Sequence, residues 1–182
     1  MRVISGSAKG RPLKAVPGMG TRPTTDKVKE AIFSMIGPYF DGGTVLDLFA
    51  GTGGLGIEAL SRGMDRAVFV DADKKSVEVV TANLEATRLS DKAEVYRNDA
   101  YRALKALSKR NVRFDLVFLD PPYKMTAIEE LIGSMRELDL LAPAAVIVVE
   151  HDAANRFAEQ IGDATRTRLV EYGETAVSVY RM

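Results

Sequence analysis

The sequence predicts an α/β fold with a mostly parallel, doubly wound sheet, and three observations support this fold class. From residue 44 onward, short apolar runs rich in β-branched residues alternate with segments whose apolar residues recur at helical spacing. A glycine-rich turn joins the first of these runs to the first helical segment. Near the end of the chain, two alternating runs flank a Gly-Glu-Thr turn, which is typical of an antiparallel hairpin. Strand–helix alternation gives a parallel sheet with right-handed crossovers, and the hairpin reverses one edge of that sheet.

Each element of the alternation can be placed from its own pattern. Several strands are apolar on both faces, as expected when helices cover both sides of a parallel sheet. They are predicted at residues 44–49, 67–70, 93–96, 115–119 and 145–150. The helices are predicted at residues 55–61, 74–87, 100–109 and 127–138. The terminal hairpin pairs residues 167–172 with residues 176–180.

The first 40 residues do not follow this alternation. Residues 2–5 and 11–16 flank a turn of small residues and predict a small β-hairpin. A helix is expected over residues 26–36, because Thr25 suits the N-cap and Asp26 complements the positive end of the helix dipole. We therefore expect one domain over residues 1–182, with an N-terminal extension (1–40) and a catalytic sheet (41–182).

Composition narrows the possible classes of protein. The chain has 182 residues, 46% of them hydrophobic and 27% charged, as in ordinary globular proteins. It has no cysteine, which excludes disulfides, thiolate metal sites and a cysteine nucleophile, and with it pyrimidine C5 methylation through a covalent cysteine adduct. No His, Asp and Glu grouping has metal-ligand spacing, so no metal is expected. No apolar run approaches the ~20 residues of a membrane span and no leader opens the chain, so we expect a cytoplasmic protein without membrane contact.

The charge of the chain is unevenly distributed. The formal net charge is zero, but residues 1–40 hold seven Lys and Arg against two acidic residues. The rest of the chain is correspondingly acidic. A basic arm on such a body is typical of a phosphate-binding surface, although a solvated basic face is the alternative.

The strongest local signal is the glycine-rich segment 45–56, which follows the first strand and opens the first helix. Glycines at this place permit a tight turn and a close approach of the backbone to a ligand. Gly51, Gly53 and Gly56 match the Gly-x-Gly-x-x-Gly fingerprint of dinucleotide sites, and Asp71 follows about twenty residues later, where a ribose-binding acid belongs. A nicotinamide-dependent oxidoreductase is therefore one reading of this segment.

Asp47, which leads into the turn, favours a different ligand. Its carboxylate would repel a pyrophosphate, whereas S-adenosylmethionine carries an ammonium and a sulfonium that favour a nearby carboxylate. Asp71 would accept hydrogen bonds from both ribose hydroxyls, and Asp99 lies where a side chain can reach the adenine. The structural alternatives are a satisfied turn carboxylate for Asp47 and N-caps of the following helices for Asp71 and Asp99. The residues predicted to bind this cofactor are Asp47, Phe49, Gly51, Gly53, Leu55, Asp71, Ala72, Asp99 and Ala100.

A second signal, Asp120-Pro121-Pro122-Tyr123, follows the fourth predicted strand. Two prolines cannot continue a ladder and instead hold a rigid turn with unpaired carbonyls. If the Asp120 carboxylate and the Pro121 carbonyl each accept one N–H, an exocyclic amino group on a base can pyramidalise and attack a methyl group. Tyr123 would stack on the base once it has left its helix. The alternative is a structural proline turn with a surface aspartate.

Together these segments resemble the bacterial 16S rRNA guanine-N2 methyltransferase family, within the Asp-Pro-Pro-Tyr class of S-adenosylmethionine-dependent amino-methyltransferases. The similarity covers nearly the whole chain. The segments that carry it are residues 4–11, 22–30, 47–53, 55–63 and 120–123.

The resemblance implies a Rossmann-like class I methyltransferase with seven strands in the order 3-2-1-4-5-7-6. It also implies that the target is one guanine of small-subunit rRNA, in an assembling particle, and we expect a monomer. Thr24 and Arg22 would lie beside the methionine end of the cofactor or at the target entrance. RNA phosphates would be held by Arg2, Lys9, Arg11, Lys14 and Arg22.

Three other readings stay open at this point. A DNA adenine-N6 methyltransferase would share the tetrapeptide and the cofactor turn. The nicotinamide-dependent oxidoreductase would share the turn alone. A non-catalytic RNA-binding assembly factor would keep the pocket without using it, although binding alone does not require the acid at position 120.

Overall fold

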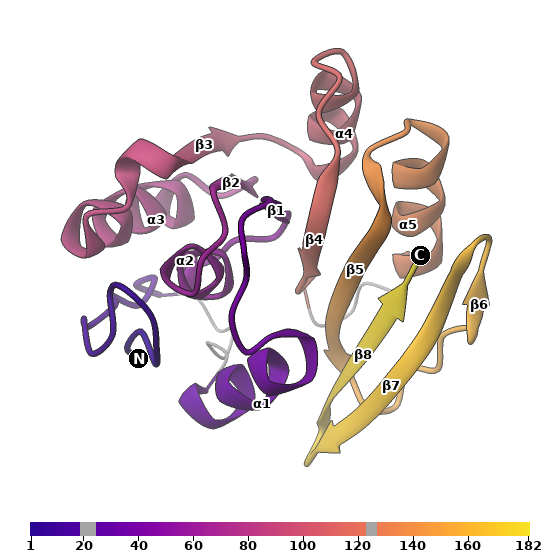
Figure 1. The fold of residues 1–182 in the computed structure, drawn as a ribbon, viewed down its shortest axis with the longest axis horizontal. Helices are drawn as coiled ribbons and strands as arrows, with labels where there is room; N and C mark the ends of the chain where they lie inside the picture. Colours follow the sequence, from indigo (N-terminus) through magenta and orange to yellow (C-terminus); the bar gives the residue numbers. More distant parts are fainter. Residues whose placement is uncertain (19–24, 123–126) are drawn as a thin grey trace.

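The computed structural model describes residues 1–18, 25–122 and 127–182. A twisted sheet runs through the molecule (Figure 1), and its strands follow the predicted pattern of apolar runs. The strands are β1 (Thr44–Asp47), β2 (Arg66–Asp71), β3 (Ala93–Arg97), β4 (Phe114–Leu119), β5 (Leu141–Asp152), β6 (Gln160–Ile161), β7 (Ala164–Tyr172) and β8 (Thr175–Arg181).

The order of the strands confirms the predicted fold class. Within the described residues the sheet runs β3-β2-β1-β4-β5-β8-β7-β6. Neighbours from β3 to β5 are parallel, whereas β8 pairs antiparallel with both β5 and β7. The sheet has eight strands instead of the predicted seven, because the two-residue strand β6 pairs with β7. So short a strand carries no alternating pattern in the sequence.

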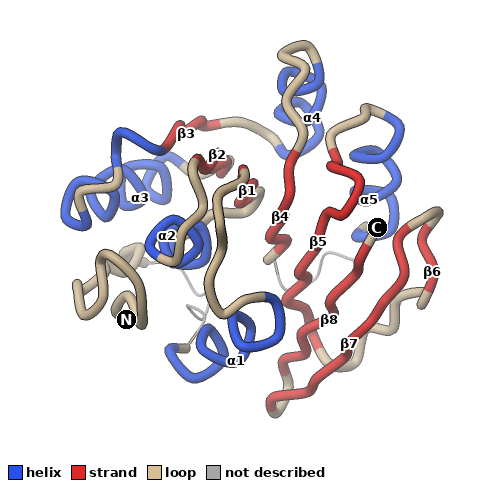
Figure 2. The backbone as a smooth tube through the Cα atoms, viewed as in Figure 1, coloured by secondary structure: helices blue, strands red, loops and turns tan. Residues whose placement is uncertain are grey.

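Helices cover both faces of the sheet, and each face has its own apolar core (Figures 1 and 2). One core joins α1, α2 and α3 to strand residues such as Val45 and Phe69, and the other joins α4 and α5 to Leu46 and Val68. Successive strand residues therefore point into opposite cores. The helices are α1 (Asp26–Ile36), α2 (Gly54–Ser61), α3 (Lys74–Thr87), α4 (Ala100–Ser108) and α5 (Ile128–Glu137), with a short 3-10 turn η1 (Ser90–Lys92) before β3.

The N-terminal segment, residues 1–18, folds back on itself with antiparallel backbone pairing but without regular strands. Arg2 and Pro12 form an isolated antiparallel bridge, flanked by a hydrogen bond from the Val3 N–H to the Arg11 carbonyl. Val3 and Leu13 are buried in the same core as α1 and α2. The predicted hairpin is therefore present as antiparallel pairing of residues 1–3 with residues 10–13, although neither arm forms a regular strand.

Glu58 on α2 anchors this segment to the body. Its carboxylate accepts hydrogen bonds from the backbone N–H groups of Ile4 and Ser5, at 2.9 and 3.0 Å. It also pairs with Lys29 of α1 at 3.3 Å and with Arg62 at 2.8 Å. The three charged side chains are almost completely buried. The first residues of the chain are thus held against α1 and α2.

Among the described residues, no helix combines the length and the apolar composition that crossing a membrane requires.

Candidate active site

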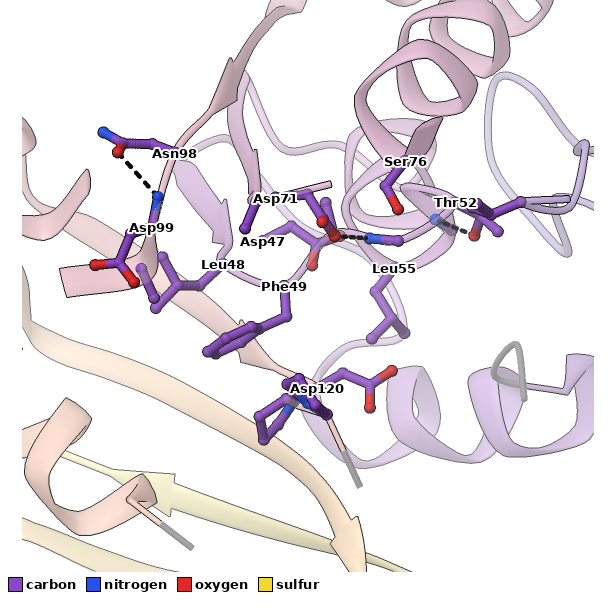
Figure 3. Close-up of a pocket in the computed structure, with 18 of the residues that line it drawn as sticks. Asp47, Leu48, Phe49, Thr52, Leu55, Asp71, Ser76, Asn98, Asp99 and Asp120 are labelled. Carbon is purple, nitrogen blue, oxygen red and sulfur yellow. Dashed lines mark hydrogen bonds between the residues drawn. The ribbon is translucent and has the colours of Figure 1, made fainter. Parts of the chain in front are cut away.

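A cavity of about 480 Å³ opens at the carboxyl edge of β1, β2 and β4, where ligands bind in open α/β sheets. Figure 3 shows its acidic side chains, Asp47, Asp71, Asp99 and Asp120, which lie at or just after the ends of β1, β2, β3 and β4, with Phe49 and Leu55 among them. It brings together most of the residues predicted to bind cofactor or to act in catalysis. Those that line it are Asp47, Phe49, Gly51, Leu55, Asp71, Ala72, Asp99, Ala100, Asp120, Pro121 and Pro122.

The glycines of the turn have different structural roles. Gly51 lines the cavity with a φ of 56°. Gly53, with a φ of 80°, is the N-cap of α2 and is not among the lining residues, so its predicted contact with a cofactor stays a prediction. At Gly56 a Cβ atom would lie 2.4 Å from the ring of Phe69, so this position needs glycine for the packing of α2 on β2.

Asp47 ends β1 with its side chain almost fully buried. Its Oδ2 accepts a hydrogen bond from the Gly56 N–H at 3.0 Å. Burial raises the pKa of Asp47 to about 7, and the nearby charge of Asp71 adds to the rise. The carboxylate is therefore costly to ionise and would be stabilised by a cation placed in the cavity.

Asp71 ends β2 and braces two turns. Its Oδ2 accepts from the Gly51 N–H and its Oδ1 from the Asp73 N–H, both at 2.9 Å. The N-cap of α3 is Asp73, which accepts from Ser76. The alternative reading of Asp71 as an N-cap was therefore wrong: the cap lies two residues further on, and Asp71 lines the cavity.

Asp99 fits both of its readings. It is the N-cap of α4, with its Oδ2 accepting from the Arg102 N–H at 3.2 Å, and it also lines the cavity. The preceding residue, Asn98, turns its side-chain oxygen to the Asp99 N–H at 2.9 Å. These residues close the cavity on the side where α4 begins.

Asp120 follows β4 and lines the cavity together with Pro121 and Pro122. Burial, and then the charge of Glu150 and a hydrogen bond to it, hold the pKa of Asp120 well above its usual range. Tyr123, the predicted stacking residue, lies outside the described residues, as do Arg22 and Thr24.

Several lining residues were not predicted from the sequence. Tyr101 follows the Asn98-Asp99-Ala100 segment, and its hydroxyl donates to Glu130 at 3.4 Å. Lys29 reaches the cavity from α1 and belongs to the buried Glu58 cluster. Met1 contributes from the N-terminal segment, together with Ala15 and Val16. Tyr101 could have been identified by its place after a strand end, whereas the N-terminal contribution has no motif that signals it.

The predicted RNA-binding residues lie on the N-terminal segment, and their role stays a prediction. Arg2 is paired with Asp26 at 3.7 Å. Lys9, Arg11 and Lys14 are exposed. Among the described residues, no group of three or more His, Asp and Glu side chains is arranged to hold a metal ion.

The architecture and the position of the site are those of proteins with the Rossmann-like methyltransferase fold. A solved structure described as the putative methyltransferase yhhF from Escherichia coli matches with a TM-score of 0.83 at 32% identity, over 100% of this chain and 97% of that one. The putative methylase HI0767 from Haemophilus influenzae matches with a TM-score of 0.80, also at 32% identity, over 100% and 97%. An RNA methyltransferase from Salinibacter ruber, solved with S-adenosyl-L-homocysteine, shares the fold at a TM-score of 0.66 and 19% identity, over 88% of this chain and 93% of that one.

Sequence similarity then defines the family. The family model described as conserved hypothetical protein 95 matches residues 1–181, and the chain belongs to this family. The putative rRNA methyltransferase YlbH of Bacillus subtilis is 56% identical over 181 residues, which are 100% of this chain and 98% of that protein. The ribosomal RNA small subunit methyltransferase D of Haemophilus influenzae is 38% identical over 151 residues, 82% of this chain and 78% of that protein. These relatives confirm the resemblance identified in the sequence.

Proposed function

We propose that this protein transfers a methyl group from S-adenosylmethionine to small-subunit ribosomal RNA, and that the acceptor is the exocyclic N2 amino group of a guanine. One observation carries the proposal. The acids at the ends of β1 and β2 and the Asp-Pro-Pro turn after β4 line one cavity, so a methyl donor and an amino acceptor can meet there.

The lining of the cavity fits the proposed cofactor. Its volume of about 480 Å³ lies within the usual range of small-molecule sites, ~300–1,000 Å³. Asp47 and Asp71 offer negative charge to a cationic ligand, and Phe49 and Leu55 offer apolar surface. The bound cofactor would supply an electrophilic methyl group on a sulfonium.

The Asp120 turn would prepare the acceptor. An exocyclic amino group is a weak nucleophile because its lone pair is delocalised into the ring. Oxygens of Asp120 and Pro121 that each accept one N–H would turn this lone pair toward the methyl group. Such preorganised acceptors act most strongly in the transition state, where positive charge develops on nitrogen.

The substrate class is supported by the relatives. YlbH is named a putative rRNA methyltransferase, and the Haemophilus influenzae relative is named for the small ribosomal subunit. The guanine-N2 specificity rests on the family resemblance of the motifs. An assembling small subunit as substrate, a monomeric enzyme and a cytoplasmic location are part of the same proposal.

The proposal is tested by incubating the protein with labelled S-adenosylmethionine and either small-subunit particles, free rRNA or DNA, followed by digestion to nucleosides. Label in N2-methylguanosine from rRNA is the expected result. N6-methyladenine in DNA would replace the proposal with the DNA methyltransferase. No transfer to any substrate would favour the RNA-binding assembly factor.

Asp120→Ala serves as the catalytic control in this assay. It removes the acceptor oxygens but leaves Asp47 and Asp71 in place, so transfer should be abolished while affinity for S-adenosylmethionine stays within a few fold. Affinity is measured by calorimetry. Unchanged turnover would remove Asp120 from the mechanism.

A further inference from the structure

Glu150 lies beside Asp120 because of the sheet register. Strands β4 and β5 are parallel, and Leu119 at the end of β4 is paired with Val149 of β5. The next residues along the two strands are Asp120 and Glu150, and their side chains are hydrogen-bonded. Asp120 lines the cavity, whereas Glu150 is not among the lining residues. Glu150 therefore contacts Asp120 from outside the cavity lining.

Two carboxyl groups that share a hydrogen bond must share a proton as well, since a carboxylate has no hydrogen to donate. Like charges this close do not both ionise near neutrality. The burial of Asp120, the charge of Glu150 and, to a lesser extent, Asp47 all raise the pKa of Asp120. Burial and the two neighbouring charges therefore favour Asp120 as the member of the pair that holds the proton.

The cations near the cavity do not offset this arrangement. Lys29 also lines the cavity, but its ammonium pairs with Glu58 and donates to the Arg2 carbonyl. The other titratable groups of the described lining are the acids Asp47, Asp71, Asp99 and Tyr101 and the amino group of Met1, and that amino group is not among the groups that shift the pKa of Asp120.

We propose that Glu150 is a positioning residue for methyl transfer: it shares a proton with Asp120, fixes the orientation of that side chain, and accepts the proton that the reaction releases. The inference rests on the proposed function. It explains how an aspartate can face a target N–H while carrying a proton. One oxygen of Asp120 donates its hydrogen to Glu150, and the other remains free to accept from the target amino group.

The proton balance of the step is complete. The lone pair of the amino nitrogen forms the new bond to the methyl carbon, and the methyl–sulfur bond breaks with its electron pair left on sulfur. The nitrogen then loses one proton to the accepting oxygen of Asp120, while the proton on the other oxygen of Asp120 moves to Glu150. Asp120 ends the step protonated as before, and Glu150 releases the extra proton to water.

The shared proton can be measured without RNA or turnover. Infrared difference spectra of wild type against Asp120→Asn, recorded across a pH series, isolate the band of the Asp120 carboxylic acid. We expect the band at neutral pH, and we expect it to disappear at a lower pH in the Glu150→Gln variant, which lacks the neighbouring charge. An Asp120 that is fully ionised at neutral pH in the wild type, or whose titration does not change in Glu150→Gln, would overturn the proposal.

Kinetics test the positioning role. Glu150→Ala leaves Asp120 without its partner, so kcat should fall by about 10²-fold, at the lower end of general acid–base effects, with KM for RNA and Kd for S-adenosylmethionine within threefold. Glu150→Gln keeps a side chain that can hydrogen-bond Asp120 but cannot accept a proton, so its kcat should lie between those of Glu150→Ala and the wild type. A loss confined to KM, or no recovery in Glu150→Gln, would contradict the positioning role.

The pH profile of kcat gives a further readout that a purely structural role would not change. In the wild type, kcat should fall at alkaline pH as the shared proton is lost and the two carboxylates repel each other. Glu150→Gln has no second carboxylate and should lack this alkaline limb. The same limb in both proteins would exclude the shared proton as its cause. If no substrate is methylated at all, the proposed function fails, while the infrared result still decides whether the proton is shared.

Discussion

At the scale of single residues, Asp47 must satisfy two opposing demands. Its burial stabilises the protonated form and raises its pKa to about 7, whereas a cationic ligand would require the ionised form. The Gly56 N–H, which donates to Oδ2, offsets only part of the cost of ionisation. The ionised Asp47 is therefore suited to bind a cation, but its burial lowers the stability of the ligand-free protein.

The affinity for S-adenosylmethionine should consequently increase with pH through the titration of Asp47. If only the ionised form binds, the protein is about 10% competent one pH unit below the pKa of about 7, so Kd should fall about tenfold between pH 6 and pH 8. Titration calorimetry across this range measures the slope. Asp47→Asn should bind more weakly and lose most of the dependence. The ionisation of S-adenosylmethionine itself affects wild type and Asp47→Asn equally. The same slope of Kd against pH in both proteins would therefore contradict the titration of Asp47 as the cause.

The stability of the ligand-free protein should decrease with pH over the same titration of Asp47. Between its ordinary pKa of 3.8 and its folded pKa of about 7, Asp47 holds a proton that the unfolded chain releases. The stability that this proton contributes is present below pH 4 and is lost as pH rises to 7. Relative to wild type, Asp47→Asn should gain several degrees in Tm between pH 5 and pH 8. A constant Tm difference across this range would contradict the raised pKa.

The sequence predicted that acidic residues follow the strands, but it did not show which of them cap helices, line the cavity or contact one another. Asp71 was expected at a strand end, yet the position of the true cap, Asp73, depends on the φ and ψ angles of the turn. Glu150 ended a predicted strand without further signal. Its relation to Asp120 depends on the register of β4 against β5, which a pattern of apolar residues does not define.

At the scale of elements, α2 approaches β2 closely because Gly56 has no side chain. A Cβ there would lie 2.4 Å from Cε1 of Phe69, whose ring is fully buried, and 3.2 Å from Oδ2 of Asp47. The helix therefore depends on this glycine both for packing and for the position of the acid that it contacts.

Gly56→Ala should destabilise the protein by about 1–3 kcal/mol, because the buried ring must shift to make room. It should also weaken S-adenosylmethionine binding through Asp47. Gly133→Ala in α5 is the matched control: a Cβ there meets nothing within 4 Å, so the same change should stabilise the protein by roughly 0.5–1 kcal/mol. Urea denaturation measures both. Equal effects at the two positions would show that contact with Phe69 is not the cause.

The buried cluster around Glu58 should be as sensitive as the core. Glu58→Gln removes the charge that compensates Lys29, and it turns an amide N–H toward donors at Ser5 or Arg62. We expect a loss of about 3–5 kcal/mol in the free energy of unfolding. Urea denaturation at neutral pH gives this quantity.

An exposed pair supplies the control for Glu58. Asp139 pairs with Arg113 at 2.6 Å, but the two side chains are 72% and 53% exposed. Asp139→Asn removes the same charge, and asparagine tolerates the left-handed backbone at this position, where φ is 56°. The change should stay within about 1 kcal/mol. A comparable loss from both substitutions would contradict a role of burial.

Helices and strands were predictable where a pattern of apolar residues extended over most of the element. In β4, for example, the last four residues, 116–119, are buried on both faces and appear in the sequence as a continuous apolar run. The attachment of the N-terminal segment to the rest of the protein was not predictable, because its backbone is held by residues distant in sequence. Ser61, for example, accepts from the Ser7 N–H through its carbonyl and from the Ala8 N–H through its hydroxyl.

At the scale of the whole molecule, charge and cavity are arranged together. The N-terminal segment carries the basic excess, and Met1, Ala15 and Val16 from the same segment line the cavity. Its backbone is anchored by Glu58, Ser61 and Asn83, and the exposed Lys14 directly precedes Ala15, which lines the cavity. A polyanion bound by this surface would be directed to the site, so the zero net charge of the protein does not exclude the proposed RNA binding.

Neutralising Lys9, Arg11 and Lys14 to Gln should therefore weaken RNA binding and lower the slope of log K against log salt by about 2 to 3, since each phosphate contact contributes roughly 0.7–0.9. Fluorescence anisotropy with an rRNA fragment at several salt concentrations measures both quantities.

The matched control neutralises Lys105, Lys109 and Arg113, exposed cations in α4 and in the turn before β4. That turn leads into the amino end of a strand whose carboxyl end meets the cavity, and α4 lies far from the N-terminal segment in Figure 1. The control removes the same charge as the first variant. If the N-terminal segment is a local phosphate-binding surface, the salt slope should change in the first variant only. An equal change of slope in both variants would mean that RNA responds to the total charge of the protein.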